Sequence, residues 1–143
     1  MTNEQVHDSP SGWVADHIQE YVESGGETGH MWRGAPTLLL TTRGRKTGKL
    51  RRSALIYGRM GDSYTVVASK GGHPKHPLWY LNLKANPEVE IQVGPEVMKA
   101  VARDASDDER HLLWEQMVRI WPAYDDYQER TMRRIPLVVL DPS

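Results

Sequence analysis

The 143-residue sequence contains no cysteine and no phenylalanine. The absence of cysteine excludes a disulfide framework, a thiolate nucleophile and a cysteine-ligated metal site. Five tryptophans and six tyrosines therefore provide all the Phe, Tyr and Trp ring contacts. Aromatic side chains with a polar group suit a site for a flat ligand, but the core would use them as well. No run approaches the roughly 18 apolar residues of a membrane span, and the first residues are too polar for a secretory signal. We therefore expect a cytoplasmic protein.

The sequence also lacks a large net charge, yet its positive charge is concentrated in one place. Lysine and arginine number 18 against 19 acidic residues, and six of the ten residues from 43 to 52 are basic. Apolar, strand-like runs at residues 37–41 and 54–57 flank this basic stretch, which places cations and free backbone N–H groups at a turn between two strands. Such a turn suits a phosphate or another multiply anionic ligand. The alternative is a solvated basic hairpin with no ligand.

Neither common phosphate-binding fingerprint is present. Gly44 and Gly48 enclose three residues where a Walker loop needs four, and Leu50 follows Lys49 where that loop needs Ser or Thr. No GxGxxG dinucleotide motif occurs either. The basic stretch therefore does not identify its ligand by itself.

Hydrophobic patterning predicts a small antiparallel barrel with flanking helices. About six strands are expected, at residues 37–42, 53–59, 63–69, 88–93, 97–102 and 135–140. Helices are expected at residues 13–24 and 77–85, after a capping box at residues 106–109, and after Pro122. Hairpins without a repeated βαβ unit favour a barrel over a Rossmann sheet. Residues 1–11 are expected to form a disordered tail, and residues 12–143 a single domain.

Two helices and one histidine pair each allow either a structural or a functional role. The amphipathic helix from Trp13 should cover one face of the sheet, or else act as a lid. The second helix is apolar nearly all round, so Asn82 needs polar partners, which are structural groups or a ligand. His73 and His76 lack a third ligand at a recognisable spacing, and we expect no metal site.

Several short blocks occur together and in a defined order. They are residues 44–48 (GRKTG), 67–72 (VASKGG), 77–87 (PLWYLNLKANP), 102–110 (ARDASDDER), 124–128 (YDDYQ) and 134–139 (RIPLVV). As a set, these blocks resemble the deazaflavin-dependent nitroreductase family over roughly residues 30 to 140. The resemblance implies a mainly β (α+β) split barrel of the FMN-binding type, and implies coenzyme F420 as the cofactor.

The resemblance also implies a set of coenzyme-binding residues. Those expected to bind the phosphodiester and the acidic oligoglutamate tail are Lys46, Thr47 and Arg51, with Arg45 and Ser53 close by. Those expected at the edge of the deazaflavin ring, largely through their backbone, are Ala68, Ser69 and Lys70. Those expected to line the coenzyme groove are Leu78, Trp79 and Asn82.

The acceptor side is implied to contain Trp121, Tyr124 and Tyr127, together with the N-terminal helix. A tyrosine hydroxyl can donate a hydrogen bond or a proton to the oxyanion that forms when a quinone accepts a hydride. The two tyrosines are therefore the candidate catalytic residues, and core packing with a satisfied hydroxyl is the alternative. Trp121 stands where the prodrug-activating nitroreductases carry a tyrosine, so the chain departs from the family pattern there.

The implied activity is reduction of a small organic acceptor, namely a quinone, an activated enoate or a nitro compound, by reduced F420. One alternative is a flavin-mononucleotide-dependent oxidoreductase on the same fold. Another is a nucleic-acid-binding barrel, although a pI near 6.6 argues against nucleic acid as a partner. A quinone acceptor would allow peripheral association with the inner face of the cell membrane. The sequence leaves monomer and homodimer open.

Overall fold

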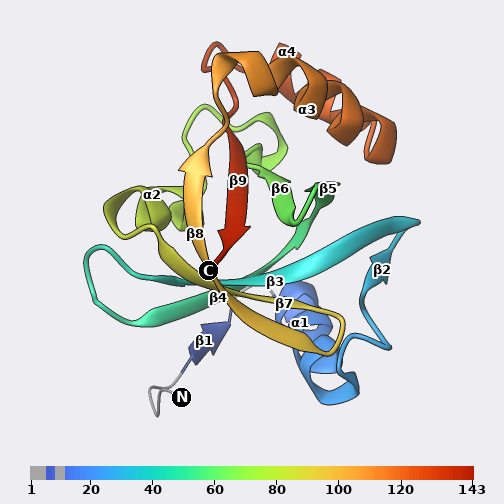
Figure 1. Cartoon of the computed structure of the whole chain (residues 1–143), viewed down its shortest axis with the longest axis vertical. Helices are drawn as coiled ribbons and strands as arrows, with labels where there is room; N and C mark the ends of the chain where they lie inside the picture. Colours follow the sequence, from blue (N-terminus) through green and yellow to red (C-terminus); the bar gives the residue numbers. More distant parts are fainter. Residues whose placement is uncertain (1–5, 9–11) are drawn as a thin grey trace.

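The computed structural model describes residues 6–8 and 12–143 (Figure 1). The strands are β1 (Val6–Asp8), β2 (Met31–Trp32), β3 (Ala35–Arg43), β4 (Leu50–Ile56), β5 (Gly58–Met60), β6 (Ser63–Val67), β7 (Glu88–Val93), β8 (Glu96–Asp104) and β9 (Leu137–Pro142). The helices are α1 (Gly12–Ser24), α2 (Leu78–Ala85), α3 (Asp107–Ile120) and α4 (Ala123–Glu129), with a 3-10 turn η1 (Lys70–Gly72). Among the described residues, no helix is both long enough and apolar enough to cross a membrane.

The strands form one sheet in the order β1-β4-β3-β7-β8-β9-β6-β5, with β2 paired to β3. The mixed α+β architecture confirms the expected class. The described part of the chain nevertheless contains nine strands rather than about six, and its hydrogen-bonded path does not close. The strand expected at residues 53–59 is divided at Tyr57, where the chain leaves β3 and joins β6. The Tyr57 N–H donates to the Pro36 carbonyl at 3.1 Å at this crossing.

The expected disordered tail at residues 1–11 is corrected at three positions, because Val6–Asp8 form β1. This strand pairs in parallel with Leu50–Arg52 of β4, so the sheet is not antiparallel throughout. The Asp8 carboxylate accepts a hydrogen bond from Nε of Arg52 at 2.7 Å and fixes the pairing. The remainder of the expected tail lies outside the described residues.

Alternation along β3 divides its side chains between two cores. Leu38 and Leu40 point into the curled sheet, where they pack with residues of β6, β7, β8 and β9 and with α2. Leu39 points the other way and contacts Ile18 and Tyr21 of α1, both fully buried. The helix expected from Trp13 therefore covers one face of the sheet.

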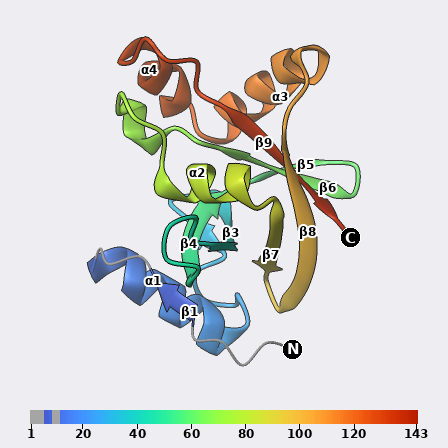
Figure 2. The ribbon, with the colours of Figure 1, turned by 90° about the vertical axis from the view of Figure 1, so that its left-hand side faces the viewer.

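A further core lies between the β6–β9 pair and the helices α3 and α4, and includes Leu113, Met117 and Tyr124. The predicted capping box begins α3, because the Ser106 hydroxyl accepts from the Glu109 N–H while the Glu109 carboxylate accepts from the Ser106 N–H. Figure 2 shows α3 and α4 at one end of the molecule and α1 with β1 at the other. The helix α2 lies between these two ends.

Candidate functional site

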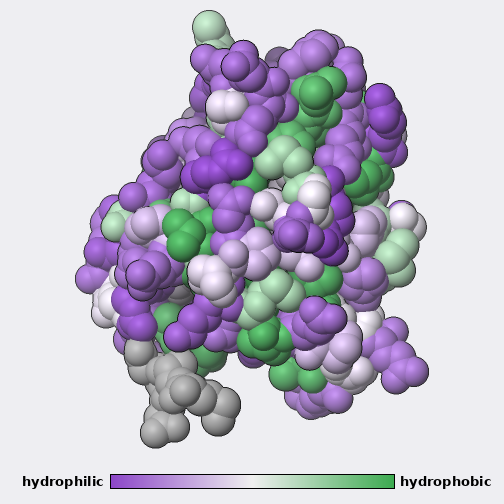
Figure 3. Space-filling model, viewed as in Figure 1, coloured by the Kyte–Doolittle hydropathy of each residue, from purple (hydrophilic) through white to green (hydrophobic). Residues whose placement is uncertain are grey.

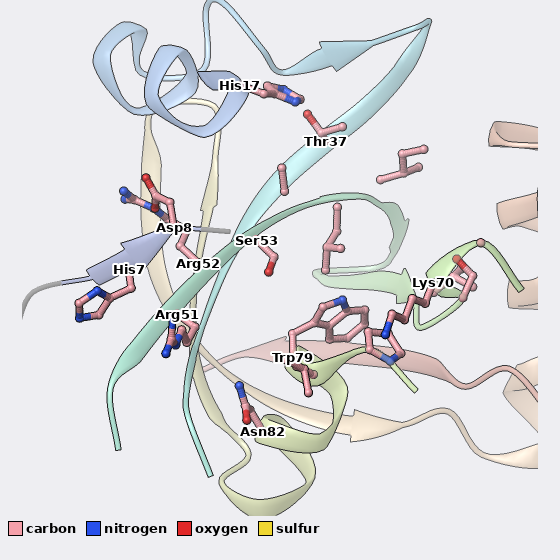
Figure 4. A pocket seen from close by; sticks show the side chains of 18 of the residues that line it. His7, Asp8, His17, Thr37, Arg51, Arg52, Ser53, Lys70, Trp79 and Asn82 are labelled. Atoms are coloured by element: carbon pink, nitrogen blue, oxygen red, sulfur yellow. The ribbon is translucent and has the colours of Figure 1, made fainter. Parts of the chain in front are cut away.

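One cavity of about 970 Å³ is lined by residues of α1, β1, β3, β4, the basic turn, the loop after β6, α2 and the α3–α4 segment. Its volume falls within the range of about 300 to 1,000 Å³ that is usual for small-molecule sites. In Figure 4, Trp79 and Lys70 appear in the middle of the view, with Arg51 and Asn82 toward one end and His17 toward the other. The cavity therefore joins segments that are far apart in the sequence.

All the predicted site residues except Ala68 line this cavity. They are Arg45, Lys46, Thr47, Arg51, Ser53, Ser69, Lys70, Leu78, Trp79, Asn82, Trp121, Tyr124 and Tyr127. Ala68 is fully buried, and its backbone polar groups already have protein partners. Its N–H donates to the Pro136 carbonyl at 3.0 Å, and its carbonyl accepts from Arg133 at 3.1 Å. The expected backbone contact of Ala68 with the ring edge is therefore not supported.

The basic turn is closed by backbone hydrogen bonds and leaves several cations exposed. Gly44 and Lys49 close the turn through an N–H to carbonyl hydrogen bond of 2.7 Å. Arg45, Lys46 and Arg51 are exposed and line the cavity. Among the described residues, these three side chains form no ion pair, so they remain available to an anionic ligand.

Asn82 ties the basic turn to α2. Its side-chain oxygen accepts from the Arg45 N–H at 3.1 Å, and its amide nitrogen donates to the Thr42 hydroxyl at 3.3 Å. Asn82 is buried, and these two partners pair both its side-chain oxygen and its amide nitrogen. The structural alternative for Asn82 therefore accounts for its burial, and the residue also forms part of the cavity wall.

The loop after β6 forms the opposite wall in an unusual backbone conformation. Lys70, Gly71 and Gly72 have successive φ angles of 47°, 62° and 82°. A lysine in the left-handed region costs about 1 to 2 kcal/mol, so surrounding contacts must hold it there. The turn presents Ser69, Lys70 and Gly71 to the cavity. No cluster of three metal-ligating side chains occurs within residues 6–8 and 12–143.

The two predicted catalytic tyrosines differ in their hydroxyl partners. Their rings meet edge to face with centroids 6.0 Å apart. The Tyr127 hydroxyl accepts a long hydrogen bond from Nε1 of Trp121 at 3.4 Å. The Tyr124 hydroxyl has no hydrogen-bond partner among the described residues, although the residue is only 5% exposed. Burial, with a smaller effect of neighbouring Tyr127, raises the pKa of Tyr124 above its ordinary value, so the hydroxyl keeps its proton.

Several cavity residues were not predicted from the sequence. Trp32 of β2 stacks on Trp121 with ring centroids 5.2 Å apart. His17 of α1 lies at the cavity, and its Nε2 is 2.6 Å from the Gly29 carbonyl. His7, Asp8 and Arg52 line the end beside β1. Of these, Arg52 carried a sequence signal through its place in the basic stretch, and His17 lies on the N-terminal helix that was expected at the acceptor side.

Comparison with known proteins places this site in a family. The family model described as F420H(2)-dependent quinone reductase matches residues 13–142. The F420H(2)-dependent quinone reductase of Mycobacterium tuberculosis is 48% identical over 129 residues, which cover 87% of this chain and 86% of that protein.

Solved structures agree with this assignment. The F420-H2 dependent reductase FDR-A is 43% identical, with a TM-score of 0.69 over 74% of this chain and 94% of that one. A protein described as a domain-swapped dimer is 39% identical, with a TM-score of 0.72 over 93% of this chain and all of that one. HutZ, a heme storage protein of Vibrio cholerae, shares only the fold at 20% identity and a TM-score of 0.58. The resemblance inferred from the sequence blocks is thus confirmed, and the chain belongs to the F420H(2)-dependent quinone reductase family.

Proposed function

We propose that this protein catalyses hydride transfer from reduced coenzyme F420 to a quinone. The observation that carries the proposal is one continuous cavity with two chemically different ends. Exposed cations of the basic turn and β4, without ion-pair partners among the described residues, line one part, and the Tyr124 hydroxyl of α4, without a hydrogen-bond partner in the same part of the chain, lines another. A long ligand with an anionic tail and a flat ring system matches this order of groups.

The residues at the basic end fit the coenzyme's charged part. Lys46 and Arg51 would bind the phosphodiester and the oligoglutamate carboxylates through charge-assisted hydrogen bonds, with Arg45 and Thr47 beside them. Trp79 and Leu78 of α2 offer apolar surface for the ring system, and Leu78 is 69% exposed. Family membership and this distribution of charge together support F420 over flavin mononucleotide.

When bound, reduced F420 supplies a hydride from C5 of its deazaflavin ring and poorly supports one-electron steps. The protein must then hold the acceptor close to that carbon and stabilise the negative charge that forms on the acceptor oxygen. Tyr124 is suited to this task because it lines the cavity, its hydroxyl keeps its proton, and that hydroxyl has no hydrogen-bond partner among the described residues. Tyr127 and Trp121 would shape the acceptor pocket, since they are already joined by a hydrogen bond.

The acceptor and the assembly are also part of the proposal. We propose a quinone as the main acceptor because of the family, while activated enoates and nitro compounds are chemically reducible by the same step. A homodimer is supported by the similarity to the domain-swapped dimer. We place the enzyme in the cytoplasm, and contact with the inner face of the membrane would follow only from a membrane-bound quinone. Figure 3 shows small, separate apolar patches on one face, and patches of this size favour no more than a transient contact with a membrane.

The proposal is tested by offering the purified protein reduced F420, reduced flavin mononucleotide and a short oligonucleotide in parallel. We expect micromolar or tighter binding of reduced F420 and its faster oxidation when menadione is added. Tight binding of flavin mononucleotide without F420 binding would instead assign a flavin enzyme. Binding of the oligonucleotide alone would assign the basic turn to nucleic acid.

A further inference from the structure

Arg133, which does not line the cavity, binds the backbone of the loop that does. Its Nη2 donates to the Ser69 carbonyl at 2.7 Å, and its Nε donates to the His73 carbonyl at 2.8 Å. Its Nη1 donates to the Ala68 carbonyl at 3.1 Å and lies 3.1 Å from Nδ1 of His76. One planar guanidinium therefore contacts the loop on both sides of the η1 turn.

The loop needs such a partner because it has little internal support. Within η1, the hydrogen bonds are those from the Gly72 N–H to Ser69 and from the His73 N–H to Lys70, at 3.0 and 3.1 Å. Lys70 adopts a left-handed conformation that is unfavourable for a residue with a Cβ atom. The Arg133 guanidinium occupies the carbonyls of Ala68, Ser69 and His73, which flank this turn and would otherwise need water or other donors.

The same arginine is anchored to the acceptor side. The Gln128 side chain, on α4, donates to the Arg133 carbonyl at 2.8 Å. The loop also touches α4 directly, since a Cβ atom on Gly72 would lie only 2.6 Å from the Tyr127 carbonyl oxygen. Arg133 thus links the loop that carries Ser69 and Lys70 to the helix that carries the tyrosines.

Arg133 forms no ion pair among the described residues, which distinguishes it from the arginines held by carboxylates at positions 52, 103 and 134. Partial burial without a counter-charge lowers the pKa of its guanidinium. Burying a guanidinium without a counter-charge costs desolvation free energy, and here only the hydrogen bonds to carbonyls offset that cost. Its geometry, rather than its charge, is therefore the feature to test.

We propose that Arg133 is a positioning residue that fixes the spacing between the coenzyme loop at residues 69–71 and the acceptor-side Tyr124 and Tyr127. The inference rests on the proposed function for the identity of these two sides. Hydride transfer depends steeply on the distance between donor and acceptor, and a displacement of about 1 Å can cost about a hundredfold in rate. Loss of the Arg133 hydrogen bonds to the loop should therefore slow hydride transfer more than it weakens coenzyme binding.

The first test compares Arg133→Ala with Arg134→Ala. Arg134 is the matched control because it is adjacent, 63% exposed in its side chain and paired with the exposed Asp107 at 3.2 Å. Without coenzyme, hydrogen exchange should accelerate at the Gly72 and His73 amides in Arg133→Ala and stay unchanged in Arg134→Ala. With coenzyme, single-turnover hydride transfer should fall by about tenfold to a hundredfold in Arg133→Ala, with a smaller change in the coenzyme Kd.

Chemical rescue separates positioning from a general loss of structure. Millimolar guanidinium chloride should restore part of the rate and the amide protection in Arg133→Ala, whereas the same concentration of ammonium chloride should not. Arg133→Lys, which keeps the charge and the fold but lacks the fork, should remain slow. Full activity in Arg133→Lys or an unchanged hydride-transfer rate in Arg133→Ala would overturn the inference. Failure of the wild-type protein to oxidise reduced F420 would instead refute the proposed function. Hydrogen exchange at the Gly72 and His73 amides would still test whether Arg133 holds the loop.

Discussion

Replacing Tyr124 by Phe tests whether a tyrosine hydroxyl takes part in hydride transfer. The Tyr124 ring is 5% exposed and packs against Trp114 and Tyr127, with centroids 6.4 and 6.0 Å away. Phenylalanine keeps these ring contacts and removes only an oxygen atom. Because that hydroxyl has no partner among the described residues, its removal leaves no group unsatisfied. The free energy of unfolding should therefore stay the same or rise slightly.

The effect on catalysis follows from the charge that forms on the acceptor oxygen. A single hydrogen-bond donor to such an oxyanion contributes about 1.4 to 2.7 kcal/mol in a partly wet site, equivalent to about tenfold to a hundredfold in rate. Tyr124→Phe should lose this factor in single-turnover reduction of menadione by reduced F420, with an unchanged coenzyme Kd. Stopped-flow absorbance of the oxidised coenzyme measures the rate, and thermal unfolding checks the fold.

Tyr127→Phe is the comparison variant. Its hydroxyl accepts from Trp121, so its removal leaves the indole N–H without that partner and should disturb packing as well as rate. The reasoning is refuted if Tyr124→Phe transfers hydride as fast as the wild-type protein while Tyr124→Ala unfolds. In that case the Tyr124 ring belongs to the core alone and the proton comes from water.

Three further predictions concern the two ends of the cavity and the start of α3. Lys46→Ala and Arg51→Ala should each weaken coenzyme binding by about 1 to 3 kcal/mol in titrations, and should have no effect on a fragment that lacks phosphate and glutamates. Trp121→Tyr should change the ratio of kcat/KM between menadione and a nitro compound without changing the coenzyme Kd. Hydrogen bonds from Arg103, and then from the N-cap backbone, lower the pKa of Glu109 from 4.5 to about 2, so this stabilisation is present above about pH 4.5 and is lost as the pH falls toward 2. Glu109→Gln should therefore lower the Tm at pH 7 by a few degrees, and the difference should shrink below pH 4.5.

Secondary-structure elements that depend on residues close together in the sequence could be predicted from it. The capping box at Ser106 and the helix expected at residues 77–85 depend on neighbouring residues, and each occurs where it was expected. The extra strands could not be predicted, because β1 and β2 are short and exist only through pairing with β4 and β3. The division at Tyr57 depends likewise on which strand lies next to each half of the segment.

The candidate site shows the same division between local and long-range causes. The sequence blocks brought Trp79 and Tyr124 into one predicted site, and the structure places both at one cavity. Ala68, directly after β6, does not line the cavity but packs in the core, and its backbone groups are paired with Pro136 and Arg133. The role of Arg133 could not be inferred either, because its partners are carbonyls 60 to 65 residues earlier in the chain.

The basic stretch illustrates what the fold adds to a charge pattern. Arg52 is held by Asp8 of β1, and Nη1 of Arg43 donates to the Gly48 carbonyl at 2.7 Å inside the turn. These two arginines therefore stabilise the sheet edge and the turn, whereas Lys46 and Arg51 point their charge toward the cavity without a counter-charge among the described residues. Cations that look equivalent in the sequence are thus divided by the fold into a set with structural partners and a set that is open to a ligand. An anionic coenzyme tail would meet the second set at little structural cost, because no ion pair in the described part of the chain has to break first.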